Sequence, residues 1–134
     1  MRTLLIFPLI ALAGGCAMNE MSARGAEREA RKQAALDTML AGYQPGEPRS
    51  CVNSRDLRGP TAYGERTLVF REGRTIWVNE TSGGCDDAGR DALITRQFGP
   101  QLCRGEIART ADLTSGFQSG SCSLGDFVPY RKPR

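Results

Sequence analysis

The hydrophobic and polar positions divide the chain into three parts. Positions 4–13 form a short apolar run that only Pro8 interrupts. Positions 17–41 are rich in Ala, Glu, Arg and Met, which favour helices, and their large apolar residues gather near the end. From position 49 onward, short runs of β-branched and aromatic residues alternate with glycine-containing segments. This pattern predicts a mainly β domain, as a small antiparallel sheet or a barrel-like fold, preceded by an N-terminal helix.

The helix is expected to span about 15–18 residues and to end near Ala41. Its last turns carry an apolar stripe with the spacing i, i+3, i+4, i+7, formed by Leu36, Met39, Leu40 and Tyr43. Gly42 fits the C-cap position, and the proline-containing segment 44–50 is expected to be a linker. We expect the last turns to dock on the domain, whereas residues 17–30 are either a solvated helical spacer or a partly disordered tether.

The clearest strand signal is a β-hairpin formed by residues 66–70 and 75–78. A two-residue loop at Glu72-Gly73 would pair Leu68 with Trp77. A three-residue loop would pair Leu68 with Ile76 instead. We expect the second register, because it gathers four apolar residues on one core face: Leu68, Phe70, Ile76 and Val78. Trp77 and Val69 would then lie on the other face, under the helix or a loop.

Beyond the hairpin the strand signals are weaker. We expect a short extended segment near Cys51, a turn at Arg58-Gly59-Pro60, and a loop or one helical turn in residues 86–95. Residues 101–111 are interpreted as one long strand with a bulge at Gly105. The remaining expectations are a loop at 113–121, a last short strand at 122–130 and a basic tail at 131–134. The cysteine-containing β domain is therefore expected to cover residues 49–130.

Composition argues against several classes of function. The 18 Lys and Arg residues and 15 Asp and Glu residues are mixed along the chain, which is not typical of a nucleic-acid-binding stripe or a polybasic membrane patch. Histidine is absent, which removes the commonest general base and the commonest metal ligand. A single domain of this size has a thin core, so covalent cross-links are expected to add to its stability.

Four cysteines lie within the predicted β domain: Cys51, Cys85, Cys103 and Cys122. In an exported protein an even number of cysteines predicts disulfides, here two of them. A zinc site and free thiols are the alternatives, but the absence of histidine and of a C-x-x-C pair disfavours zinc. Three pairings are possible. We favour Cys51–Cys122, which would join the ends of the domain, together with Cys85–Cys103 inside that loop.

Residues 1–15 have the layout of a bacterial export signal. Arg2 precedes the apolar run, and the small residues Gly14 and Gly15 end it directly before Cys16. The sequence Leu12-Ala13-Gly14-Gly15-Cys16 resembles the lipobox of bacterial lipoproteins, with Ala13 where Leu is commonest. This resemblance implies that Cys16 becomes the acylated first residue, and that residues 16–48 are a lipid-bearing N-terminus, helix and linker. The alternative is an ordinary signal peptide with an incidental cysteine.

The residues after Cys16 suggest which membrane is involved. In Gram-negative lipoproteins, an Asp directly after the acylated Cys favours retention at the inner membrane. Ala17 and Met18 follow Cys16 in this chain. The resemblance therefore implies a lipid anchor in the outer membrane, with the protein facing the periplasm.

A second resemblance covers about residues 50–130. Cys51 precedes the hairpin, Leu102-Cys103-Arg104-Gly105-Glu106 follows it, and Cys122-Ser123-Leu124-Gly125-Asp126-Phe127 lies near the end. This order resembles a group of small exported proteobacterial proteins of unknown function, which share Leu-Cys-x-Gly-acidic and Cys-x-Leu-Gly-x-Phe segments. The resemblance implies an exported, disulfide-bonded, mostly antiparallel β domain, and it implies no activity.

The chain offers few candidates for chemistry. Asp86, Asp87 and Asp91 lack the ligand spacing of a calcium loop, and no phosphate-binding glycine motif occurs. Glu80 with Glu106 is one possible pair of catalytic carboxylates. The aromatic residues Trp77, Phe98 and Tyr63 would either line a ligand groove or, as we expect, pack in the core.

The sequence therefore predicts a lipid-anchored envelope protein that acts by binding or as a structural module, with neither a metal nor a cofactor. The lipid on Cys16 would hold the protein at the membrane. The expected partner is an envelope protein or the cell wall, not a nucleic acid. The alternative is a small periplasmic hydrolase that uses paired carboxylates.

Overall fold

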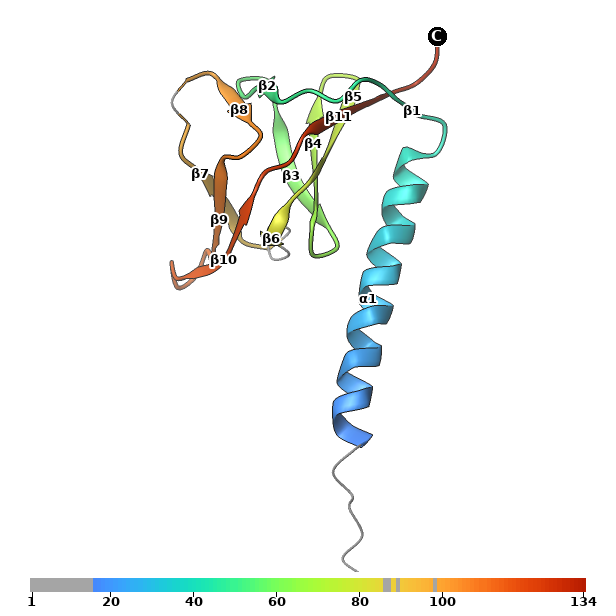
Figure 1. Ribbon diagram of the computed structural model, residues 1–134, viewed down its shortest axis with the longest axis vertical. Helices are drawn as coiled ribbons and strands as arrows, with labels where there is room; N and C mark the ends of the chain where they lie inside the picture. Colours follow the sequence, from blue (N-terminus) through green and yellow to red (C-terminus); the bar gives the residue numbers. More distant parts are fainter. Residues whose placement is uncertain (1–15, 86–87, 89, 98) are drawn as a thin grey trace, which may run out of the picture.

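The computed structural model describes residues 16–85, 88, 90–97 and 99–134, so the predicted signal at 1–15 lies outside the described part (Figure 1). The chain is mainly β, with antiparallel sheets, an N-terminal helix and two disulfides, as the sequence predicts. The elements are α1 (Cys16–Leu40), β1 (Gln44–Pro45), β2 (Cys51–Asn53), β3 (Arg58–Tyr63), β4 (Thr67–Glu72), β5 (Thr75–Glu80), β6 (Ser82–Gly84), β7 (Ala92–Thr95), β8 (Gln101–Cys103), β9 (Ile107–Ala111), β10 (Gln118–Ser123) and β11 (Phe127–Arg131).

The strands form three antiparallel sheets. A five-stranded sheet has the order β1-β11-β5-β4-β3, a four-stranded sheet has the order β6-β10-β9-β7, and β2 pairs with β8. The chain passes from the first large sheet to the second after β5 and returns between β10 and β11 (Figure 1).

All three sheets contribute to one main core. The buried side chains in it are Val52, Leu68, Phe70, Trp77, Cys85, Ala88, Leu102, Ala108, Cys122, Leu124 and Phe127. Phe127 is fully buried, and its ring lies 5.9 Å from that of Phe70. The burial of apolar surface in this core is the main force that holds the sheets together.

The predicted hairpin is present as β4 and β5, but its register differs from both expected registers. Leu68 pairs with Asn79 and Phe70 pairs with Trp77, so that Gly73 and Arg74 form the two-residue loop. Gly73 has a φ of 55°, which suits the first central position of a tight hairpin turn. As a result Leu68, Phe70 and Trp77 face the main core. Val69, Ile76 and Val78 face the opposite side, so the expected single face of Leu68, Phe70, Ile76 and Val78 is wrong.

The helix covers that opposite side and forms a second core. Leu36 is buried against Val69, Ile76 and Val78, and Met39, Leu40 and Tyr43 pack around it, as the apolar stripe predicts. Gly42 has a φ of 79° after the last turn, which agrees with its expected role as the C-cap. With 25 residues, α1 is longer than we expect from the sequence.

The N-terminal half of α1 extends beyond the β domain (Figure 1). The backbone N–H of Glu65, in the turn between β3 and β4, donates to the carboxylate of Glu29 at 3.1 Å. Residues 21–28 are exposed. No helix within the described part of the chain is long and apolar enough to cross a membrane.

The disulfides are Cys51–Cys103 and Cys85–Cys122, so the pairing that we favour from the sequence is wrong. Cys51 and Cys103 lie directly opposite each other on β2 and β8, with their Cα atoms 4.0 Å apart. Cys85 follows β6, which pairs with the β10 segment that contains Cys122. Strand pairing therefore brings the thiols together: the first link joins two paired strands, and the second joins β10 to the residue that follows β6.

Several weaker strand predictions also need correction. The expected turn at residues 58–60 is part of β3, where the pairing with β4 is irregular and the Gly59-Pro60 bond is cis. The expected long strand at 101–111 is divided into β8 and β9 by a turn at Gly105. Parts of the expected loops at 86–95 and 113–121 form β7 and β10, and Gln44–Pro45 in the expected linker forms β1.

Candidate binding groove

Several residues of the segments 102–106 and 122–127 are buried or disulfide-bonded. Leu102 is buried, and Cys103 forms a disulfide. Gly105, in the turn that leads to β9, has a φ of 85°, which favours glycine. Leu124 and Phe127 are buried in the main core. The buried residues of these segments therefore belong to the main core, whereas Gly105 and Glu106 line the groove described below.

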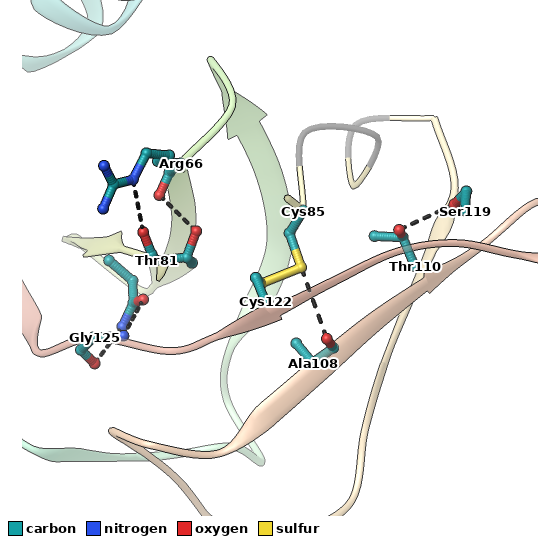
Figure 2. Close-up of a disulfide and its surroundings, with 9 residues drawn as sticks. Arg66, Thr81, Cys85, Ala108, Thr110, Ser119, Cys122 and Gly125 are labelled. Carbon is teal, nitrogen blue, oxygen red and sulfur yellow. Dashed lines mark hydrogen bonds between the residues drawn. A yellow bond between two sulfur atoms is a disulfide. The ribbon is translucent and has the colours of Figure 1, made fainter. Parts of the chain in front are cut away.

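Figure 2 shows how the chain is fixed where the two large sheets meet. Asn79 is fully buried, and its side-chain amide donates to the Gly125 carbonyl at 2.8 Å. The Asn79 side-chain oxygen accepts from the Gly125 N–H at 3.0 Å. Thr81 and Arg66 are joined by reciprocal hydrogen bonds nearby. The Cys85–Cys122 disulfide lies beside Ala108 of β9.

A groove of about 670 Å³ lies over the outer surface of the four-stranded sheet. Residues of β7, β9 and β10 and of the turns that flank β9 line it: Ile94, Arg96, Gly105, Glu106, Ile107, Arg109, Thr110, Ala111, Gly116 and Gln118. Two isoleucines on this surface are more than half exposed, at 52% for Ile94 and 53% for Ile107. Exposed apolar side chains in a concave region are typical of a binding surface.

Strand register places four of these side chains in a crossed arrangement. Ile94 pairs directly with Arg109, and Thr95 pairs with Ala108. Arg96 directly follows β7, and the same register continued by one residue would place it opposite Ile107, the first residue of β9. The alternation of side chains along a strand then puts both arginines and both isoleucines on the outer face of the sheet. Each pair of like residues occupies one diagonal.

A hydrogen-bonded turn between β9 and β10 borders the groove. The Asp112 carboxylate accepts hydrogen bonds from the N–H groups of Ser115 and Thr114 and from the Ser115 hydroxyl. These bonds, the Ser115 N–H first, lower the pKa of Asp112 from its ordinary value of 3.8. Leu113 and Phe117 in the same turn are exposed. The turn therefore presents a fixed backbone beside the lining residue Gly116.

The two carboxylates that the sequence suggests as a catalytic pair have different surroundings. Glu80 accepts a hydrogen bond from the Thr67 hydroxyl at 2.8 Å. Glu106 lines the groove, and its buried Oε2 atom has no hydrogen-bond partner among the described residues. Among the contacts of the described residues, none is between the side chains of Glu80 and Glu106. Glu106 is the single carboxylate among the lining residues.

The suggested aromatic groove is not formed by Trp77 and Tyr63. Trp77 is buried in the main core and donates from its ring nitrogen to Glu72 at 2.8 Å. Tyr63 packs in the second core, where its hydroxyl contacts the sulfur of Met39. These two residues therefore lie on opposite sides of the five-stranded sheet. Phe98 lies outside the described residues.

Of the three aspartates considered for calcium, Asp86 and Asp87 lie outside the described residues. Asp91 accepts a hydrogen bond from the hydroxyl of Ser119. The described part of the chain contains no cluster of three or more Cys, Asp or Glu side chains that could hold a metal ion. Cys16, the predicted acylation site, is the first residue of α1.

Among the groove residues, only Glu106 is a candidate from the sequence. The signal that could identify the others is the alternation Ile94-Thr95-Arg96 and Ile107-Ala108-Arg109, which has the period of a half-exposed strand. That alternation predicts two half-exposed strands, but it does not predict that β7 and β9 are neighbours, and only their pairing places the two segments side by side.

Comparisons with models of protein families, with curated proteins and with solved structures found no match to this chain.

Proposed function

We propose that this protein is a lipid-anchored, non-enzymatic binding module of the bacterial envelope. The observation that carries the proposal is Cys16, which ends a signal-like sequence and begins the helix that leads away from the β domain. The two disulfides indicate an extracytoplasmic protein, because such bonds form and persist in oxidising compartments. Acylation at Cys16 would attach the chain to the outer membrane, facing the periplasm.

The arrangement of α1 supports a role as a spacer between lipid and domain. Residues 16–28 precede the contact at Glu29, and thirteen helical residues cover about 20 Å at 1.5 Å per residue. A domain held at this distance could reach an envelope protein or the cell wall. The groove on the four-stranded sheet is the surface that we assign to the partner, because exposed isoleucines and charged groups meet there.

The hydrolase alternative depends on two cooperating carboxylates. Glu106 is in the groove, but Glu80 makes its contact with Thr67 instead. Two guanidinium groups and one carboxylate suit recognition of a partially anionic partner better than acid–base catalysis by a carboxylate pair. We therefore favour binding.

The anchor is tested by expressing the full-length chain in a Gram-negative host that is labelled with a radioactive fatty acid. The unchanged protein should take up the label and sediment with the outer membrane, whereas Cys16→Ser should remain unlabelled and soluble. Ala17→Asp is the matched control, because it should retain the label and move to the inner membrane. An unlabelled protein, or a Cys16→Ser variant that still sediments with membranes, would contradict the anchor.

A further inference from the structure

We propose that the groove binds a short, extended, acidic segment of a partner protein, with two of its carboxylates on Arg96 and Arg109. This inference rests on the proposed binding function and adds the chemical class of the ligand. Three properties of the groove lead to it: two arginines that form no ion pair with a described residue, their spacing, and a sheet edge at β7 that no other described strand covers.

The two arginines are available to a ligand. Both are exposed and both line the groove, and neither forms an ion pair with another residue of the described part of the chain. Arg104, one residue before the lining residue Gly105, differs because it pairs with Asp126 at 3.1 Å. Guanidinium groups bind carboxylates strongly because they donate two parallel hydrogen bonds. An anionic partner is therefore the complement of this surface.

The spacing of the arginines favours an extended peptide. Arg109 pairs with Ile94, and Arg96 follows β7 two residues after Ile94, so we expect the two arginines to have the spacing of a diagonal pair on neighbouring strands, about 7–8 Å. Alternate residues of an extended chain point to the same side and are separated by about 6.6 Å. Two acidic residues with one residue between them would therefore place their carboxylates on the two arginines. Ile94 and Ile107, on the other diagonal, offer apolar surface to neighbouring side chains of the segment.

The groove is open on the side of β7. This strand is at the edge of the four-stranded sheet and pairs only with β9 among the described residues. An edge strand has backbone N–H and C=O groups that are free to pair with another chain. Because no described strand pairs with the outer edge of β7, an extended segment can reach the groove from that side and lie across the face of the sheet, with its acidic side chains on the two arginines.

The test uses the full chain, exported by the host so that both disulfides form and purified in detergent whether or not it carries a lipid, and three fluorescein-labelled peptides of eight residues. The first peptide contains two glutamates separated by one valine. The second has the same composition with the glutamates adjacent, so that they point to opposite sides of an extended chain. The third has lysines in place of glutamates. Fluorescence anisotropy should show that the first peptide binds at least tenfold more tightly than the other two.

Variants of the protein show whether the groove is the site. Arg96→Glu and Arg109→Glu should each weaken the binding of the first peptide at least tenfold. Arg74→Glu is the matched control, because Arg74 is an exposed arginine in the turn between β4 and β5, outside the groove. Ile107→Ser should also weaken binding, and Leu113→Ser, at an exposed leucine that does not line the groove, should not. Thermal melting of every variant confirms that it is folded.

Three results would overturn the inference. The first is equal affinity for all three peptides, and the second is an equal loss of binding in Arg74→Glu. The third is complete displacement of the first peptide by millimolar inorganic phosphate with no preference for glutamate spacing, which would indicate a simple anion site. None of these results depends on acylation of Cys16, so failure here and failure of the anchor are distinguishable.

Discussion

Gly125 lies where the chain leaves β10 and enters β11 in the other sheet. A Cβ atom at this position would be 2.1 Å from the Glu80 carbonyl oxygen, much closer than any non-bonded contact allows. Asn79 holds the same residue through its N–H and C=O groups. The close approach of two backbones therefore requires glycine, which explains its place in the Cys-x-Leu-Gly-x-Phe segment.

Gly125→Ala should lower the free energy of unfolding by about 3 kcal/mol, because the added methyl group forces apart two backbone segments that are otherwise fixed. Urea denaturation followed by tryptophan fluorescence measures the change. Gly99→Ala is the control, since its Cβ would meet nothing within 4 Å. Equal stability of the two variants would show that the backbones at Gly125 and Glu80 can separate at little cost.

At the scale of elements, α1 illustrates how one helix serves two purposes. Its last turns pack Leu36 against Val69, Ile76 and Val78, whereas Met21, at 77% exposure, lies in the part that extends beyond the domain. An amphipathic end therefore docks the helix, and a polar beginning leaves it solvated.

Leu36→Ala should destabilise the docked helix by about 3 kcal/mol, because it removes most of a buried side chain from the second core. Trypsin should then cleave more rapidly after Arg31 and Lys32. Met21→Ala provides the comparison on the same helix and should leave the cleavage rate unchanged. If both variants are cleaved at the same rate, the helix does not depend on the packing of Leu36.

At the scale of the whole molecule, the two disulfides interleave. One links residues 52 positions apart and the other links residues 37 positions apart, and Cys85 lies within the span closed by Cys51 and Cys103. Each link restricts the unfolded chain. The Cys51–Cys103 link lies within the two-stranded sheet, and the Cys85–Cys122 link lies within the region of the four-stranded sheet.

Replacing both cysteines of the core link, Cys85→Ala with Cys122→Ala, should lower the free energy of unfolding by about 4 kcal/mol, as the chain-entropy relation gives for a loop of this length. The pair Cys51→Ala with Cys103→Ala should produce a loss of similar size. Urea titration of the unchanged and variant proteins measures both. If the urea midpoint of a double variant equals that of the unchanged protein, the disulfide removed in that variant does not stabilise the fold.

The fold class follows from local patterns, but the register does not. The runs around Phe70 and Trp77 predict a hairpin, yet either face of each strand is rich in apolar residues. Period-two alternation therefore could not choose between the registers. The actual choice places Val69 against the helix and Trp77 in the main core, so that both faces of the sheet are covered.

For a similar reason, local sequence patterns could not predict the groove. Glu106 could be named as a candidate from its chemistry, but Ile94 and Arg109 become neighbours only when β7 pairs with β9. Those two strands are separated by a segment that contains β8, which belongs to another sheet. No spacing along the chain records that arrangement.

The sequence by itself determined the mainly β class, the N-terminal helix with its docking stripe, and the presence of two disulfides, because each depends on residue type and short-range periodicity. Only the tertiary structure decided which cysteines are joined, which strand faces meet, and where two arginines and two isoleucines form one surface. Those features depend on pairing between distant strands, and that pairing is selected by the packing of the entire core.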